Sequence, residues 1–192
     1  MKLFLKEPTI DDKDEIIKMC EEFRNSSDEY KFEGLGNFKD VVSDNYEEFL
    51  NNCEKNKHID KINPNFANQT TYILIDESGH VYGGGNLRHE LKGNLINIGG
   101  HIGYGIRPSE RGKGYGPIQL RLFLEKAREK NIERTLLTCR ENNIPSAKTI
   151  EKCCGIKDKS VPSMYEGIME SRYWIDIENL LIRTNNDKNK IK

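Results

Sequence analysis

The sequence contains no long hydrophobic run and no excess of charge of either sign. Its apolar stretches are a few residues long, whereas a membrane-spanning helix needs about 20 apolar residues. Lys6 interrupts the N-terminal stretch where a signal peptide would require a continuous apolar core, so we expect a cytoplasmic protein. The 30 Lys and Arg residues against 31 Asp and Glu residues leave a net charge of -1. Because nucleic acids and anionic membranes attract a basic excess, we expect neither as a partner.

Cysteine is also sparse, and its arrangement excludes the usual metal and disulfide frameworks. The five cysteines are odd in number, form no C-x-x-C pair and have no histidine at metal-ligand spacing: Cys20, Cys53, Cys139, Cys153 and Cys154. Adjacent cysteines rarely have the geometry of a bridge, and cysteine is a common small apolar residue of protein cores. We therefore expect reduced thiols and no bound metal.

The length of 192 residues corresponds to about one domain. Hydrophobic residues make up 35% and charged residues 32% of the chain, which is enough apolar material, in periodic clusters, to form a core. Residues 183–192 are nearly all Asn, Asp, Lys and Thr. We therefore predict a single domain over residues 1–182 and a flexible tail over 183–192.

The first half of the chain predicts two helices and a set of strands. Residues 2–6 fit an edge strand, and Thr9 begins a helix with Ile16, Cys20 and Phe23 on one face. A Gly- and Asn-rich break at 34–37 precedes a second helix with apolar residues on one face, namely Val42, Tyr46, Phe49 and Cys53. Three antiparallel strands are then expected over residues 70–75, from residue 81 and over residues 96–106.

From residue 107 the pattern changes to a β-loop-α-β-α unit. A Gly-rich loop leads into a helix from about Gly114 to Lys130, followed by a strand at 135–139, a helix from about Pro145 to Cys153 and a last strand at 172–177. The order predicts an α+β fold: a mixed, mostly antiparallel central sheet flanked by helices, with one switch to parallel pairing.

The Gly-rich loop carries the chemical signal. Glycines and two cations at the start of a helix gather backbone N–H groups and the positive end of the helix dipole, which favours a phosphate. A Walker A loop requires Ser or Thr after the lysine, but Gly114 follows Lys113. A dinucleotide-binding motif requires a glycine where Pro117 stands. ATP, GTP and NAD are therefore disfavoured.

The pattern Arg111-Gly112-x-Gly114-x-Gly116, with a strand before it and the Asn143-x-x-Ser146-Ala147 helix start after it, resembles the acyl-coenzyme A binding core of the GNAT superfamily of N-acetyltransferases. The resemblance covers residues 70–156 well in element order, and 1–60 and 160–180 in outline. It is closest to bacterial acetyltransferases of unassigned substrate, through Gly100–Tyr104, Thr149–Lys152 and Arg172–Ile175.

The resemblance implies a β-loop-α-β-α site for acetyl-coenzyme A as the acyl donor. It assigns the pyrophosphate to the backbone of the loop, the pantetheine arm to the strand end, and a further contact to Asn143. The implied residues are Ile106, Arg107 and Pro108 for the pantetheine arm, and Arg111, Gly112, Lys113, Gly114, Tyr115 and Gly116 for the pyrophosphate. Glycine suits such a loop because a Cβ would block a diphosphate lying on the N–H groups.

One departure from the family concerns the proton donor. A tyrosine near the end of the second of these helices often protonates the departing thiolate, and Ile150 stands at the matching position. His101 and Tyr104, on the strand that the family places at the thioester, are our candidates for proton transfer, although packing within the sheet is an equally simple role for each. Tyr173 and Trp174 could line the acceptor pocket or the core, and Gly83–Gly85 could shape the acceptor side.

The resemblance predicts an N-acetyltransferase that moves the acetyl group to a primary amine of a small molecule by direct attack. Two alternatives stay open: a catalytically silent acyl-coenzyme A sensor, which the Ile150 departure favours, and a protein or peptide N-terminal acetylase. A homodimer is compatible with this fold. The sequence does not identify the acceptor amine.

Overall fold

The computed structural model describes residues 2–29, 31–164 and 166–178, and its strands form two separate antiparallel sheets. The first has the order β1 (Leu3–Lys6), β2 (Gln69–Asp76), β3 (Val81–Arg88) and β4 (Ile102–Ile106). The second has the order β5 (Arg134–Arg140), β7 (Met169–Asp176) and β6 (Ile156–Pro162). The helices are α1 (Lys13–Asn25), α2 (Tyr46–Asn56), α3 (Tyr115–Glu129) and α4 (Ile144–Lys152). The predicted tail lies outside the described residues.

These elements confirm the predicted α+β class and correct it in four places. The strand expected from residue 96 begins at Ile102, because residues 93–96 form a 3-10 turn. The second helix begins at Tyr46, and Val42 is exposed in front of it rather than on its buried face. Strand β6 was not predicted: its apolar residues are few and mostly exposed. In place of the expected parallel pairing, every ladder of the described strands is antiparallel.

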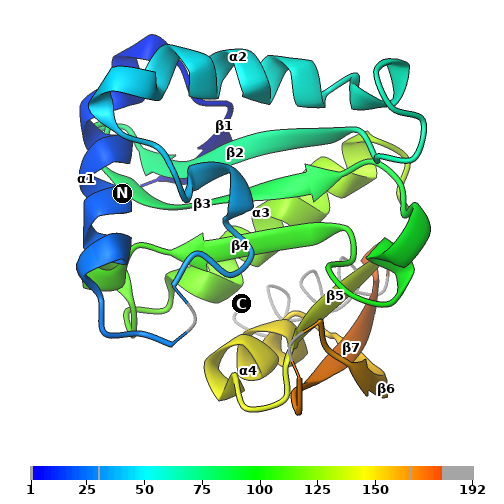
Figure 1. Ribbon diagram of the computed structural model, residues 1–192. Helices are drawn as coiled ribbons and strands as arrows, with labels where there is room; N and C mark the ends of the chain where they lie inside the picture. The colour runs from blue at the N-terminus through cyan, green and yellow to red at the C-terminus, as the bar shows by residue number, and fades with distance from the viewer. Residues whose placement is uncertain (1, 30, 165, 179–192) are drawn as a thin grey trace, which may run out of the picture.

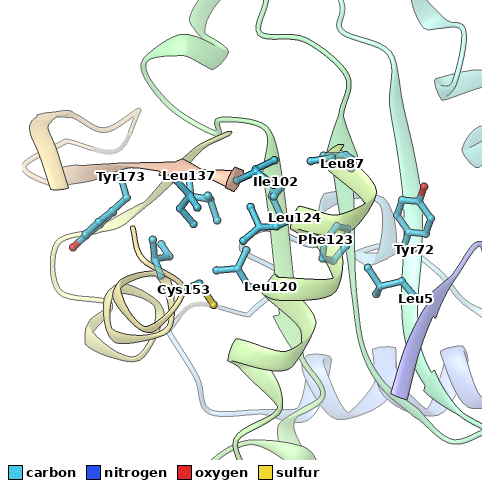
Figure 2. Packing of buried hydrophobic residues seen from close by; sticks show 14 of the residues in the cluster. Leu5, Tyr72, Leu87, Ile102, Leu120, Phe123, Leu124, Leu137, Cys153 and Tyr173 are labelled. Atoms are coloured by element: carbon cyan, nitrogen blue, oxygen red, sulfur yellow. The ribbon is translucent and has the colours of Figure 1, made fainter. Parts of the chain in front are cut away.

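Helix α3 joins the two sheets through one apolar cluster. Leu120, Phe123 and Leu124 of this helix are fully buried, and they pack between β2–β4 on one side and residues of the second sheet such as Leu137 and Tyr173 on the other (Figure 2). Burying side chains of this size contributes about 1.5–3 kcal/mol each. The packing therefore holds the second sheet to the first without a shared ladder.

Helices α1 and α2 cover the opposite face of the first sheet with a second apolar cluster (Figure 1). The three consecutive glycines of β3 allow this close packing on both faces. A Cβ at Gly84 would lie 2.9 Å from the ring of Phe38, and one at Gly85 would lie 2.8 Å from the ring of Phe123. The glycines are needed for the two cores, and none of them lines the cavity described below.

Strands β4 and β5 meet at a single point before they diverge (Figure 1). The backbone N–H of His101 donates to the carbonyl of Leu136 at 2.7 Å, and the N–H of Leu136 donates to Nδ1 of the His101 ring at 3.0 Å. Burial, reinforced by the charge of Arg88, lowers the pKa of His101 to about 4. The neutral imidazole is therefore a structural acceptor that closes the junction of the two sheets.

No helix of the described residues is long and apolar enough to cross a membrane. Within the same residues, no three His, Cys, Asp or Glu side chains are grouped as metal ligands.

The His101 ring predicts a pH-dependent stability. Its pKa is lower in the folded chain than in the unfolded chain, so the unfolded chain binds more protons between about pH 6.5 and pH 4, and the free energy of unfolding should fall as pH falls through this window. His101→Leu should lose this component and, by leaving the Leu136 N–H without its acceptor, should lower the stability at pH 7 by about 1–3 kcal/mol.

The measurement is urea unfolding at pH 7 and pH 5, with His58→Leu at an exposed position as the control. The control should keep the wild-type dependence on pH. Equal pH dependence in wild type and His101→Leu would show that the ring is protonated alike in the folded and unfolded chains.

Candidate functional site

A cavity of about 860 Å³ opens where β4 and β5 diverge. Residues of both strands line it, among them Tyr104 and Ile106 of β4 and Thr138 and Arg140 of β5. Each strand is at the edge of its own sheet, so each presents backbone N–H and C=O groups that no neighbouring strand of the described chain pairs. Such a slot suits an extended ligand with amide groups, which can add itself between the edges like a strand.

The Gly-rich loop forms the floor of this cavity at the start of α3. Gly112 has φ +75° and Gly114 has φ +88°, a region that side chains with a Cβ rarely adopt, and a Cβ at either position would point into open space. Gly114 is the N-cap of α3, whose first turn contains no acidic residue. Loop and helix end together leave backbone N–H groups free for an anion.

The cationic side chains around the loop form ion pairs with carboxylates of the same chain. Arg107 is buried and bonds to Glu22 at 2.6 Å and to Glu15 at 2.9 Å. Arg111 donates to Asp28 at 2.7 Å, and Lys113 bonds to Glu110 at 3.0 Å while half of its side chain is exposed.

The implied coenzyme residues fall into two groups. Arg107, Pro108 and Lys113 do not line the cavity, whereas all the others do: Ile106, Arg111, Gly112, Gly114, Tyr115, Gly116 and Asn143. The Asn143 side chain accepts from the N–H of Ser146 at 3.2 Å and so caps α4. Gly116 also lets α3 approach α4, because a Cβ there would lie 3.3 Å from the Thr149 hydroxyl. Coenzyme binding by all these residues stays a prediction.

Tyr104 and His101 occupy different environments. The Tyr104 hydroxyl is enclosed beside α4, and burial raises the pKa of this phenol, which the nearby hydroxyls of Ser146 and Thr149 lower only in part. None of the described residues forms a hydrogen bond of normal geometry with that hydroxyl. His101 does not line the cavity, and its Nδ1 is occupied by Leu136. The role of His101 as a proton acceptor remains a prediction that this geometry does not support.

The carboxylates of Glu33 and Glu170 form an acidic cluster beside Arg140 at the cavity wall, which the sequence analysis missed. Glu33 forms an ion pair with Arg140, and burial raises the pKa of Glu33, with Arg140 opposing and Glu170 reinforcing the shift. Glu170 is buried and accepts from the Ser163 hydroxyl at 3.0 Å. No local motif links the three positions, because they come from the segment after α1, from β5 and from β7.

Gly34 positions this segment against β4. Its φ is +77°, and a Cβ would lie 2.7 Å from the backbone nitrogen of Tyr104. The glycine was visible in the sequence as a helix break, but its contact with β4 was not. By contrast, Tyr173 is a core residue and Trp174 stacks with Arg134 at 4.8 Å, so neither lines the cavity.

The open edges of β4 and β5, the Gly-rich loop and the charged side chains all line one cavity, an arrangement that suits an acyl-thioester ligand. The family model of the acetyltransferase (GNAT) domain matches residues 2–155. The chain therefore belongs to the GNAT acetyltransferase family, whose members are acetyl-coenzyme A-dependent acyltransferases. No curated protein matches the chain.

Solved structures of low sequence identity share the fold. A spermidine N-acetyltransferase SpeG mutant from Vibrio cholerae is 15% identical, with 95% of this chain and 98% of that chain covered and a TM-score of 0.62. An N-acetyltransferase from Staphylococcus aureus Mu50 is 14% identical, with coverage of 92% and 99% and a TM-score of 0.59. A candidate ribosomal-protein-serine acetyltransferase from Vibrio cholerae is 14% identical, with coverage of 92% and 94% and a TM-score of 0.62.

The loop geometry predicts that the free backbone N–H groups of the loop contribute more to coenzyme A affinity than the charge of Lys113 does. Gly114→Val should weaken binding at least tenfold, since valine disfavours φ +88° and its side chain fills the space over the N–H groups. Lys113→Ala should weaken it less than about threefold, because an exposed cation paired to Glu110 adds a small, salt-screened attraction.

Titration calorimetry with coenzyme A at two salt concentrations measures both effects. Gly79→Val is the matched control, because Gly79 has φ +87° and open space around it but does not line the cavity. A larger loss in Lys113→Ala than in Gly114→Val would mean that side-chain charge dominates the site.

Proposed function

We propose that the protein transfers the acetyl group of acetyl-coenzyme A to a primary amine of a small molecule in the cytoplasm. The observation that carries this proposal is the single cavity that joins the open edges of β4 and β5 to the acidic cluster of Glu33 and Glu170. The slot and the glycine loop suit the pantetheine and pyrophosphate of the donor. The carboxylates suit an ammonium group of the acceptor.

The reaction proposed is direct attack without a covalent enzyme intermediate. The amine nitrogen forms a bond to the thioester carbonyl carbon, the carbon–sulfur bond breaks, and the products are the N-acetylated amine and free coenzyme A. One proton leaves the nitrogen and one is taken up by the sulfur. The protein's task is to hold both substrates in line and to handle these two protons.

The amine proton is the more costly of the two. An alkylamine with a pKa near 10.4 is about one part in 2,500 free base at pH 7, a handicap of about 4.6 kcal/mol, whereas a thiol of pKa about 8.5 lies only about 2 kcal/mol from pH 7. Glu33 is the proposed acceptor of this proton. Its pKa is raised by burial, which brings a carboxylate nearer to the operating pH of a general base.

Tyr104 is the proposed donor to the departing sulfur, in place of the tyrosine that Ile150 replaces. Burial raises the pKa of the phenol, so the hydroxyl keeps its proton, and Tyr104 is one of the residues that line the cavity. The hydroxyl has no protein hydrogen bond of normal geometry, although Ser146 and Thr149 lie close to it, and a ligand atom would complete its bonding. This reasoning narrows the predicted part of Tyr104 in proton transfer to that of a proton donor.

Two other functions remain to be separated from this one. A silent acyl-coenzyme A sensor would explain Ile150, but it would give no role to the Tyr104 hydroxyl or to the carboxylates of the acceptor side. An N-terminal acetylase would act on a peptide amine in the same pocket. We keep the homodimer, likewise, as a proposal.

The first test is release of free coenzyme A thiol from acetyl-coenzyme A over a broad panel of small amines. We expect turnover with kcat/KM that rises through neutral pH as the free amine fraction grows, and a loss of about 10²–10⁴-fold in Glu33→Gln. Glu48→Gln is the matched control, since Glu48 is exposed on α2 and does not line the cavity. Intact coenzyme A binding without turnover on any amine would favour the sensor.

Tyr104→Phe should lower kcat about 10–100-fold with little change in the KM for acetyl-coenzyme A, because it removes one hydroxyl that acts late on the sulfur. The pH dependence contributed by the amine should stay as in the wild type. Tyr173→Phe, in the core outside the cavity, is the matched control. A wild-type kcat in Tyr104→Phe would remove the residue from the proton chemistry.

A further inference from the structure

Arg88 is a charged residue of the cavity wall that neither the coenzyme nor the proton transfers account for. It ends β3 and lines the cavity together with Glu33 and Glu170. Its Nη1 donates to the carbonyls of Gly99 at 3.1 Å and Gly100 at 3.0 Å. These bonds fix the guanidinium at the point where β4 begins, but two neutral carbonyls do not neutralise its charge.

The charge of Arg88 has no counter-ion among the residues that the structure describes. Every other arginine of the cavity wall has an acidic partner: Arg111 pairs with Asp28, and Arg140 pairs with Glu33. Burial alone shifts the pKa of Arg88, and it lowers it, with no carboxylate acting in the opposite direction. Arg88 is partly buried, and a charge withdrawn from water is normally paired because the withdrawal is costly.

The remaining nitrogens of Arg88 are available to a ligand. Nε and Nη2 have no acceptor among the described residues. Neither nitrogen is fully shielded from solvent. A guanidinium with a free edge binds a carboxylate by two parallel hydrogen bonds. The cavity is thus lined both by a cation without a counter-ion among the described residues and by carboxylates suited to an ammonium group.

Resting on the proposed function, we propose that the acceptor is an amino acid-like zwitterion whose carboxylate pairs with Arg88 while its amine lies toward Glu33. Arg88 is then a specificity-determining residue for the acetyl transfer. A polyamine, which has no carboxylate, would leave the Arg88 charge unpaired and would meet it with a second cation.

The experiment compares acceptors that differ only in a carboxylate, in wild type and in Arg88→Gln, by thiol release from acetyl-coenzyme A. The pairs are lysine with 1,5-diaminopentane, and phenylalanine with 2-phenylethylamine, and spermidine is added as a polyamine. The two members of a pair also differ in amine pKa, so the decisive quantity is how the variant changes the ratio of their kcat/KM values. The difference in amine pKa is the same for both proteins, so it does not affect the change in this ratio between wild type and variant.

We expect the wild type to prefer the carboxylated member of at least one pair by tenfold or more. Arg88→Gln should reduce that preference at least tenfold, mainly through KM, and change kcat/KM for the decarboxylated partner less than threefold. Arg88→Lys should restore part of the preference. Arg128→Gln, which removes an exposed arginine of α3, should leave it unchanged.

The outcomes separate this inference from the proposed function. Thiol release with plain amines or spermidine but no carboxylate preference, or an equal loss on both members of a pair in a folded Arg88→Gln, overturns the zwitterion proposal and leaves the acetyltransferase intact. No thiol release with any amine, with coenzyme A bound, overturns both. If Arg88→Gln does not fold, the wild-type ratios and Arg88→Lys decide the question.

Discussion

The site depends on the failure of β4 and β5 to pair beyond a single contact. The two hydrogen bonds between His101 and Leu136 bring the sheets together at one point, and the cavity begins directly after it. Had the ladder continued, the strand edges would pair with each other and no slot would exist. Unpaired strand edges are normally a liability in water. Here they are the backbone groups that an amide-bearing ligand can use.

The separation of the sheets requires that something else hold them, and α3 does so. Its buried face packs against both sheets at once, while its N-terminus carries the glycine loop. One helix therefore links the core to the anion site, and a change that tilts α3 would move the loop relative to the slot. On the other face, the contact of Gly34 with the backbone of Tyr104 ties the segment that bears Glu33 to the same strand. The segment that bears Glu33 and the slot beside Tyr104 are therefore both positioned by β4.

The sequence identified the elements whose signals are local and missed those that depend on distant contacts. The start of α3 at the glycine loop and the Asn143 cap of α4 each depend on a few adjacent residues. The start of each helix was predicted to within about one residue. Strand β6 has little apolar periodicity, because it is an exposed edge, and was missed. The same limit applies to the site. The Gly-rich loop is a contiguous motif, whereas Glu33, Arg88 and Glu170 come from three distant segments that only the fold brings to one cavity.

His101 and Tyr104 show why proximity in sequence is a poor guide to chemistry. Only three positions separate them in the sequence. The His101 ring accepts a hydrogen bond at the junction of the two sheets, whereas Tyr104 lines the cavity beside α4. The difference follows from what each side chain meets: the His101 ring accepts a backbone N–H that would otherwise be unsatisfied, while the Tyr104 hydroxyl has no such partner. Burial holds the first neutral and the second protonated. This difference is why we propose Glu33, a partly buried carboxylate of the cavity wall whose pKa burial raises, as the proton acceptor in place of His101.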